Sequence, residues 1–291
     1  MKSVVVTGVS TGIGLGIAKY LLSRGIAVFG SVRSERDAER LQCEMCPGLK
    51  PLVFDVTDEA AIRKAAEKVR RDLGGVRLYG LINNAGIAVA GPLLELPTPE
   101  LRQQLEINVL GPLSVARAFA PLMRTWPLQM ERPGRIINIS SIASRLAPPF
   151  LGPYAMSKGA LDVMSESLRR ELMIFGIDVI IVAPGNIATP IWHKAQQLDF
   201  AQYFGSPYFR ALKRAQKMMV RNGLRGWPPE RVGKVVYEAL TVQRPKVRYT
   251  AVAGRIRNWV IPTLLPHRVL DKLLARSFGI LGKPNQGPAP D

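Results

Sequence analysis

The chain has 291 residues, of which 47% are hydrophobic and 21% charged. This apolar content is enough for a sizeable core and excludes a chain that is disordered throughout. The formal net charge is +18, and residues 190–291 carry 18 Lys/Arg against 5 Asp/Glu, so most of the basic surplus is C-terminal. Such a surplus suits an anionic lipid, a nucleic acid or an acidic partner, or it is simply a solvated basic face.

The sequence gives no sign of a membrane span, because no run of about 18 apolar residues occurs. Met1 leads directly into a strand-like segment without a signal-peptide pattern, so we expect a cytoplasmic protein, either free or peripheral at a membrane surface. Cys43 and Cys46 form a C-x-x-C pair with no second cysteine pair and no nearby His. We therefore predict free thiols and no metal site; the alternative is a redox or metal role for the pair.

The first elements predict a nucleotide-binding unit. Residues 4–6 are a β-branched run typical of a buried parallel strand. A glycine-rich turn over residues 7–14 follows, and then an apolar-periodic helix that stops at Gly25. Such a turn lets a pyrophosphate approach backbone N–H groups at a helix N-terminus. The spacing Gly-x-x-x-Gly-x-Gly departs, however, from the Gly-x-Gly-x-x-Gly fingerprint.

The second predicted strand, residues 27–32, bears on the choice of cofactor. Folds that bind NAD usually place a carboxylate near the end of this strand, whereas an Arg there accommodates a 2′-phosphate. Here Arg33 follows the strand, and no carboxylate occurs before Glu35. The pattern favours NADP. The alternative is that Arg33 is a surface cation in a loop rich in charge.

The rest of the chain alternates between strand-like and helix-like segments. We expect strands at 51–55, 78–82, 136–140, 177–183 and 247–253, and helices at 58–72, 101–123, 153–175 and 229–240. The helix at 101–123 should be interrupted near Gly111 and Pro112. Alternation of this kind predicts the α/β class with a Rossmann-like, doubly wound parallel sheet in a single domain.

Three residues form a candidate catalytic group. Tyr154 and Lys158 are four positions apart, so on a helix they share one face. A nearby cation favours ionisation of a phenol, whose ordinary pKa is about 10, and would let Tyr154 act as a general acid or base. Ser141 follows the strand at 136–140 and could hydrogen-bond a substrate oxygen. Taken alone, the Tyr/Lys pair can equally be an ordinary feature of a helix surface.

Taken together, these motifs resemble the short-chain dehydrogenase/reductase family, and within it the hydroxysteroid and retinol dehydrogenases. The resemblance runs from about residue 4 to 189, in the family's order, through Thr7, Gly8, Gly12, Gly14, Asp55, Asn83, Asn84, Ala85, Gly86, Asn108, Ser141, Tyr154, Lys158, Pro184, Gly185 and Thr189. It implies an NAD(P)-dependent oxidoreductase in which Tyr154 exchanges the proton at the substrate oxygen and Ser141 orients that oxygen. Lys158 would bind the nicotinamide ribose and lower the tyrosine pKa, and Asn108 would anchor a water.

The resemblance also implies a set of residues that hold NADP. They are Gly8, Ser10, Thr11, Gly12, Ile13, Gly14, Arg33, Asp55, Val56, Asn83, Ala85, Gly86, Asn108, Tyr154, Lys158, Pro184, Gly185, Ile187 and Thr189. The glycine turn would meet the pyrophosphate, Asp55 the adenine and Thr189 the nicotinamide amide. Structural roles remain open for three of them, because Asp55 and Thr189 can cap helices and Asn108 can be a buried hinge amide.

The C-terminal third divides into three predicted parts after a dinucleotide-binding core of residues 1–189. Residues 190–228, rich in aromatic residues and Met, indicate a helical lid over a lipophilic substrate such as a steroid, a retinoid or a long-chain alcohol or ketone, or else helices packed on the core. Residues 229–254 complete the core. Residues 255–291 form a basic amphipathic extension that lies on a membrane surface or packs on the core or a second subunit.

Two functions of different classes remain in view. The first is hydride transfer between NADP and a lipophilic alcohol or carbonyl, by an enzyme that forms a homodimer or homotetramer as its relatives commonly do. The second is a non-catalytic NADP-binding regulator or scaffold, which is disfavoured because such proteins commonly lack the tyrosine or the lysine. Nucleic-acid binding is suggested by charge alone, without a recognisable motif, and is not expected.

Overall fold

The computed structural model describes residues 2–45, 48–123 and 134–281. Within them, seven parallel strands form one sheet in the order β3-β2-β1-β4-β5-β6-β7. The strands are β1 (Ser3–Val6), β2 (Ala27–Val32), β3 (Leu49–Val53), β4 (Gly80–Asn83), β5 (Gly134–Ile139), β6 (Ile177–Pro184) and β7 (Arg248–Ala251). The strand order reverses between β1 and β4, so the predicted doubly wound α/β sheet is confirmed.

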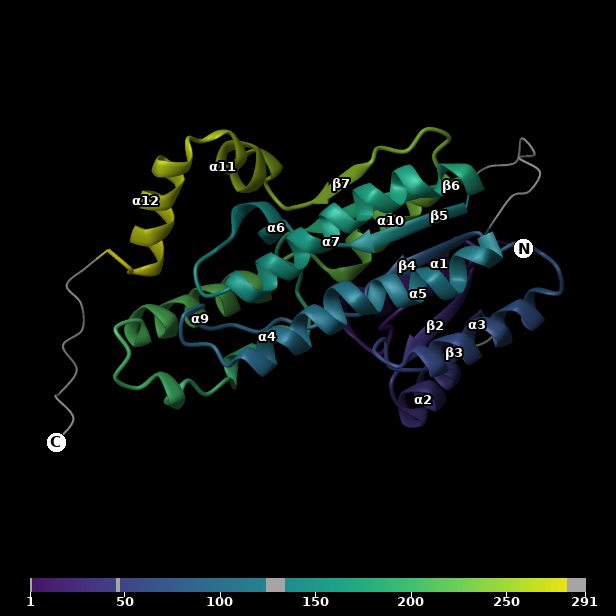
Figure 1. Cartoon of the computed structure of the whole chain (residues 1–291), viewed down its shortest axis with the longest axis horizontal. Helices are drawn as coiled ribbons and strands as arrows, with labels where there is room; N and C mark the ends of the chain where they lie inside the picture. The colour runs from purple at the N-terminus through teal and green to yellow at the C-terminus, as the bar shows by residue number, and fades with distance from the viewer. Residues whose placement is uncertain (1, 46–47, 124–133, 282–291) are drawn as a thin grey trace.

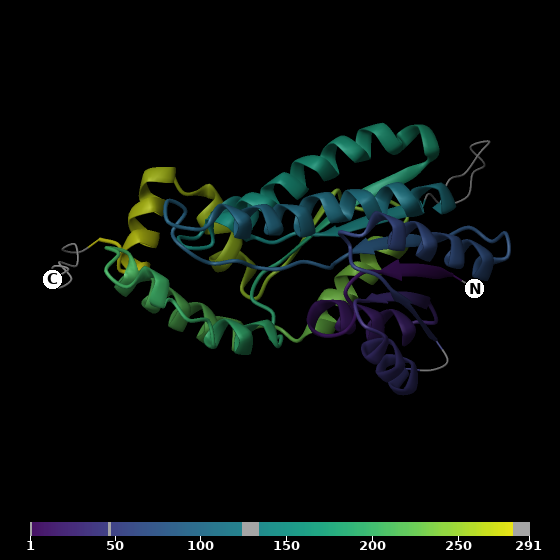
Figure 2. The same ribbon diagram turned by 60° about the horizontal axis from the view of Figure 1, so that its bottom comes forward.

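Helices cover both faces of the sheet (Figures 1 and 2). One face packs against α1 (Gly12–Leu22), α2 (Glu35–Met45) and α10 (Pro229–Thr241); the other packs against α3 (Glu59–Leu73), α5 (Gly111–Phe119) and α7 (Gly152–Glu171). Neighbouring side chains of a strand point to opposite faces. Val4 and Val6 accordingly join the first apolar cluster and Val5 the second. This two-sided burial explains the unbroken valine run.

Several elements differ from the sequence prediction. The third strand begins at Leu49 and ends before Asp55. The helix α2 was not expected, because its first turn is highly charged and looked like a loop. The long helix expected at 101–123 begins earlier, as α4 (Thr98–Leu105), and passes through a π-helical turn, η1 (Glu106–Leu110), into α5 and the short helix η2 (Ala120–Met123). The expected interruption near Gly111 is therefore this π-turn.

Two short helices flank α7. The helix α6 (Ala143–Leu146) follows β5, and the 3₁₀ helix η3 (Leu172–Phe175) completes the segment that was expected to be helical as far as residue 175. Of the two cysteines, Cys43 is exposed and unbonded, whereas Cys46 lies outside the described residues.

The expected lid contains α8 (Ile191–Gln196), η4 (Ala201–Tyr203) and α9 (Phe209–Leu224). The expected extension contains η5 (Ile256–Val260), α11 (Ile261–Leu264) and α12 (His267–Phe278). A third apolar cluster joins the two parts, and its buried members are Phe150, Phe200, Tyr203, Ala211, Leu212, Ala215 and Phe278. Many aromatic side chains of the lid are therefore buried in this cluster, where they pack against the C-terminal extension. Among the described helices, none is long and apolar enough to cross a membrane.

Candidate active site

The candidate site lies where the strands end. Because all seven strands are parallel, the turn after β1, the segment after β4 and the residues after β5 and β6 meet at one edge of the sheet. Thr7 joins the first two of these segments, since its Oγ1 accepts from the N–H groups of Asn84 and Ala85 at 2.9 and 3.0 Å. The Asn84 side chain donates in turn to the carbonyls of Thr7 and Gly8. The resemblance did not assign Asn84 a cofactor contact, and it braces the turn.

The glycine turn has the shape that a phosphate cradle needs. Gly8 and Gly12 have φ values of 70° and 61°, which favour glycine. A Cβ on Gly14 would collide with the Gly8 carbonyl and lie 2.5 Å from Asn84 Nδ2. Thr11 occupies the N-cap of α1 without a side-chain cap bond. Since α1 begins at this turn, its first N–H groups and its dipole suit an anion, and these residues fit a dinucleotide.

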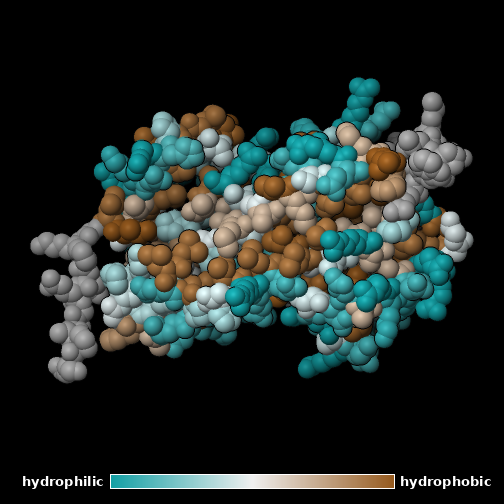
Figure 3. Space-filling view, viewed as in Figure 1, coloured by the Kyte–Doolittle hydropathy of each residue, from teal (hydrophilic) through white to brown (hydrophobic). Residues whose placement is uncertain are grey.

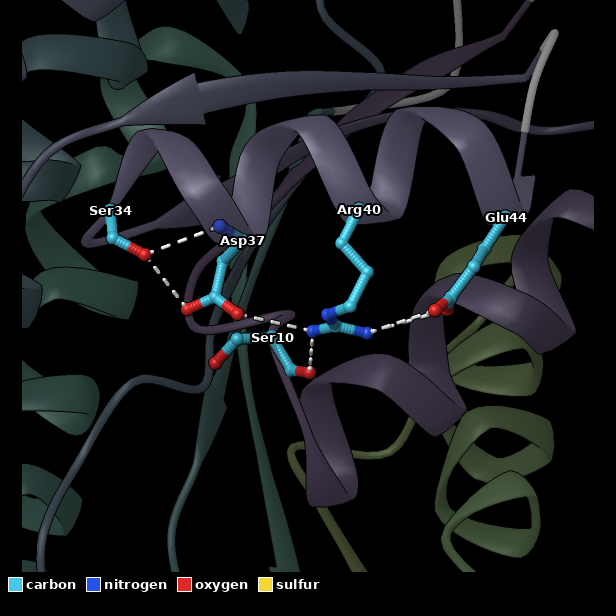
Figure 4. A network of polar contacts seen from close by, with 5 residues as sticks. All are labelled: Ser10, Ser34, Asp37, Arg40 and Glu44. Atoms are coloured by element: carbon cyan, nitrogen blue, oxygen red, sulfur yellow. Dashed lines mark hydrogen bonds and ion pairs between the residues drawn. The ribbon is translucent and has the colours of Figure 1, made fainter.

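A polar network holds the turn from the side of α2 (Figure 4). Arg40 donates to the Ser10 carbonyl at 2.9 Å and to Asp37 at 3.2 Å, and it also pairs with Glu44. The bond to Asp37 raises the pKa of the Arg40 guanidinium. Sequence reasoning missed Arg40, although the spacing of Asp37, Arg40 and Glu44 by three and four residues is the signal of a paired helix surface.

Arg33 is exposed directly after β2, and Ser31, in that strand, accepts from the Gly8 N–H at 3.1 Å. The end of β2 therefore lies against the glycine turn. Arg33 therefore follows directly after the strand that contacts the glycine turn.

Asp55 and Val56 lie between β3 and α3. Asp55 accepts from the backbone and the hydroxyl of Thr57 at 2.9 and 2.8 Å, whereas Asp58 caps α3 by accepting from Ala61. The helix-cap alternative for Asp55 is therefore wrong. Val56 is buried, and a Cβ added to Gly111 would lie 2.9 Å from it, so Val56 supports the start of α5.

Asn83 is buried under the site. Its Nδ2 donates to Asn138 Oδ1 at 2.9 Å, and Asn138 donates to Ser165 at 2.8 Å. The side-chain Nδ2 of Asn83 thus ties β4 to β5 and, through Asn138, to α7. Ala85 and Gly86 continue from it along the edge, and a Cβ added to Gly8 would lie 3.0 Å from Ala85 Cα.

Asn108, Tyr154 and Lys158 converge next to Gly86. A Cβ on Gly86 would lie 3.0 Å from Asn108 Oδ1 and 3.6 Å from Lys158 Nζ. Lys158 is buried and donates to the Ile139 carbonyl at 2.9 Å, with its Nζ 5.8 Å from the centre of the Tyr154 ring. The chain of contacts from Gly8 through Ala85 and Gly86 thus connects the glycine turn to this lysine.

Asn108 lies in the π-turn η1 and is fully buried. It exchanges two 2.9 Å hydrogen bonds with the backbone of Ile87 and donates a third to Ser157, which donates to the Tyr154 carbonyl at 2.8 Å. These bonds match the structural alternative of a buried hinge amide. They also fix Asn108 between the segment after β4 and the helix α7, and π-turns are frequent at functional sites.

Ser141 is hydrogen-bonded to Tyr154, and this bond lowers the tyrosine pKa. Burial acts in the opposite direction and is the larger effect, so the pKa of Tyr154 is raised above 10. For Lys158, burial lowers the pKa to about 8, while the charge of Asp162 raises it. The expectation that Lys158 lowers the Tyr154 pKa stays a prediction; its Nζ lies 5.8 Å from the centre of the Tyr154 ring and donates to the Ile139 carbonyl.

The segment after β6 closes the edge. Gly185 donates to Ala251 at 3.0 Å, next to Pro184 at the end of β6, and Ile187 is buried beside Trp227. A Cβ on Gly12 would lie 3.5 Å from Thr189, so the lid begins directly across from the glycine turn. Of the remaining expected residues, Ile13 packs on the core in the first turn of α1. The glycine turn, the segment after β4 and the segment after β6 therefore surround the candidate site.

Known proteins are similar to this chain over nearly its whole length. Residues 2–199 match the family model described as short chain dehydrogenase. The chain is 37% identical over 286 residues to the NADPH-dependent 3-dehydrocapnine reductase of Ornithobacterium rhinotracheale, covering 96% of this chain and 98% of the relative. It is 33% identical to retinol dehydrogenase 5 of Homo sapiens, covering 97% and 90% of the two chains.

A solved structure has the same fold. The crystal structure of a short chain dehydrogenase from Burkholderia cenocepacia in complex with NADP superposes with a TM-score of 0.70 at 25% identity, covering 94% of this chain and 99% of the other.

Proposed function

Because this chain belongs to the short-chain dehydrogenase/reductase family, and is therefore an oxidoreductase that acts on CH–OH or carbonyl groups with NAD(P), we propose that it transfers a hydride between NADP and a lipophilic substrate. The observation that carries the proposal is the meeting of Ser141, Tyr154 and Lys158 at the edge of the sheet, next to Gly86 in the segment that contacts the glycine turn. A cradle for the cofactor and an acid for the substrate oxygen are then adjacent.

Each residue of the group has a role that its position supports. The cofactor, when bound, supplies or accepts the hydride at its nicotinamide. In carbonyl reduction the Tyr154 hydroxyl donates its proton to the substrate oxygen, and the Ser141 hydroxyl donates a hydrogen bond that orients that oxygen. The Lys158 ammonium stabilises the tyrosinate left behind, and Asn108 keeps α7 in register with the segment after β4.

The preference for NADP rests on Arg33, an exposed cation where a 2′-phosphate would lie. We expect Arg33→Ala to weaken the binding of NADPH by at least tenfold and that of NADH by less than about threefold. The reason is that a charge-assisted contact to phosphate contributes roughly 1.5 to 3 kcal/mol. Fluorescence titration of both cofactors measures this. Arg36→Ala, which removes a neighbouring exposed cation, is the matched control. Equal weakening of the two cofactors would remove Arg33 from the phosphate site.

The lipophilic substrate is inferred from the names of the relatives, one a retinol dehydrogenase. Loss of NADPH absorbance across ketosteroids, retinal and medium- and long-chain ketones and aldehydes tests the inference. We expect turnover with one of these carbonyl classes and little with short polar carbonyls. NADPH binding without turnover of any carbonyl would favour the alternative, a non-catalytic NADP-binding regulator or scaffold.

Two features of the assembly belong to the same proposal. The chain forms a homodimer or homotetramer through helices that flank the site. Its C-terminal extension, which exposes Ile256 and Leu264 among basic residues, contacts a membrane surface peripherally.

A further inference from the structure

A cleft of about 660 Å³ lies between α9 and α12, away from the residues described above. Its lining residues are Phe209, Arg210, Lys213, Arg214, Lys217, Met218, Arg221 and Ser277. Five of the eight are cations, and none is a carboxylate. The cleft is open to solvent, and four of its cations are exposed: Arg210, Arg214, Lys217 and Arg221. Figures 1 and 2 show both helices at the end of the molecule where the C-terminal extension lies.

The cations of the cleft come from one face of α9. Their positions advance by three, one, three and four residues, which keeps them on one side of a helix. The opposite side carries Ala211, Leu212 and Ala215, which are buried in the third apolar cluster. Packing therefore fixes which way α9 faces and aims its basic stripe into the cleft.

This basic stripe has no counter-charge of its own. The helix α9 contains no Asp or Glu, and none of its cations takes part in an ion pair formed within the described residues. The surface helix α3 differs, because there Arg63 pairs with Glu59 and Arg70 with Glu67. Like charges gathered without partners repel one another, and a bound anion relieves that repulsion.

The walls of the cleft are set by contacts of α12. Arg214 Nε donates to the Ser277 carbonyl at 3.1 Å, and Phe278 is buried against α9. Phe209 and Met218 add half-buried apolar surface, and Lys213 Nζ lies 5.7 Å from the centre of the Phe209 ring. Anion-binding groups and an apolar wall are thus side by side, as an amphiphile requires.

We propose that the cleft between α9 and α12 binds the anionic headgroup of an amphiphile, a phosphate, sulfate or sulfonate, with its first methylene groups against Phe209. Lysine and arginine donors suit these oxyanions. The neighbouring surface of α12 exposes Leu273, which favours a headgroup with an acyl chain over a free inorganic anion. Figure 3 shows hydrophobic and hydrophilic side chains next to each other at this end. The site stands independently of hydride transfer.

Calorimetric titration of the full chain with decyl phosphate and with inorganic phosphate tests the proposal. The variant Lys217→Gln/Arg221→Gln removes two cations of the cleft, and Lys64→Gln/Arg71→Gln removes two exposed cations of α3. Unchanged NADPH affinity shows that each variant is folded. We expect decyl phosphate to bind the wild type at least tenfold more tightly than phosphate does. The cleft variant should bind decyl phosphate at least tenfold more weakly than the wild type, and the α3 variant should bind it with wild-type affinity.

Flotation with phosphatidylcholine vesicles, with and without phosphatidylglycerol, identifies the source of the amphiphile. Binding to anionic vesicles that the cleft variant loses supports a bilayer lipid, whereas binding of decyl phosphate alone supports a soluble amphiphile. Equal affinity for phosphate and decyl phosphate would contradict the proposal that the ligand is an amphiphile. A cleft variant that binds decyl phosphate like the wild type would contradict the proposal that the ligand binds in this cleft. Since binding is measured without turnover, neither result depends on the proposed reaction.

Discussion

The charge of Lys158 depends on a residue one turn further along α7. Tyr154, Lys158 and Asp162 follow one another at intervals of four, so they form a stripe on the helix. Asp162 is held by Arg248, whose Nη1 donates to it at 2.7 Å, and Arg248 also donates to Ser144 at 3.1 Å. Burial lowers the lysine pKa to about 8, and Asp162 keeps it from falling further.

Replacing Asp162 by Asn should therefore lower the Lys158 pKa below about 8, because the carboxylate that favours the ammonium is gone and Arg248 is left nearby. If carbonyl reduction needs the ammonium, the fall of kcat at alkaline pH begins at a lower pH in Asp162→Asn than in the wild type. The activity of this variant at pH 8 should then be roughly several-fold lower relative to pH 6. The pH profile of kcat measures this. Asp162→Glu retains the charge and should retain the wild-type profile; an unchanged profile in Asp162→Asn would show that Asp162 has only a structural role.

The sequence could identify site residues whose partners lie within a few positions along the chain. The interval between Tyr154 and Lys158 is one helical turn, so their shared face follows from spacing alone. Arg248 lies 86 positions from Asp162, and no local pattern connects them. Likewise, the raised pKa of Tyr154 comes from burial by distant segments, which spacing does not show.

The elements that sequence predicted best are those with strong periodicity or a demanding turn. The valine run of β1 and the glycine turn before α1 were both correct, since each must bury two faces or adopt unusual φ values. The helix α2 was missed because only Ala38 and Leu41 of its residues are buried, which leaves almost no apolar period. The observed strand ends differ from the predicted ones because a strand's register with its neighbour, such as Val28 with Leu49, depends on long-range pairing.

The turn before α1 offers a test at the scale of an element. Gly14→Ala should abolish NADPH binding and lower the melting temperature, because the new Cβ would collide with the Gly8 carbonyl and push Asn84 away. Gly159→Ala, in α7, is the matched control, since its Cβ meets only the Ser144 carbonyl at 3.7 Å. That variant should be neutral or stabilised by up to about 1 kcal/mol, the helix propensity difference.

Cofactor titration and thermal denaturation of the two variants measure the difference. If Gly14→Ala bound NADPH as well as Gly159→Ala does, the turn would not cradle the cofactor.

At the scale of the whole molecule, the helices next to the site leave apolar side chains uncovered. Leu110 at the end of η1, and Met156 and Val163 on α7, are 47%, 44% and 68% exposed. The helices α5 and α7 lie side by side on one face of the molecule (Figures 1 and 2). Apolar side chains on neighbouring helices are typical of an interface between subunits.

We expect the wild type to be a homodimer or homotetramer and Val163→Glu to raise its dissociation constant at least tenfold, because the interface would bury an unpaired carboxylate. Val76→Glu places the same charge at an exposed valine between α3 and β4 and should leave the assembly intact. Sedimentation velocity over a range of concentrations gives the constants. A monomeric wild type, or equal behaviour of the two variants, would exclude this face.

The role of Tyr154 is tested by the turnover of Tyr154→Phe with NADPH and whichever carbonyl substrate the wild type reduces. The substitution removes one hydroxyl and keeps the ring that packs in α7. We predict that kcat falls by at least about a hundredfold, the usual contribution of a positioned general acid, while the NADPH dissociation constant changes by less than about threefold. A variant that retained turnover within a fewfold of the wild type would contradict the role of Tyr154 as the acid, and with it the proposed mechanism.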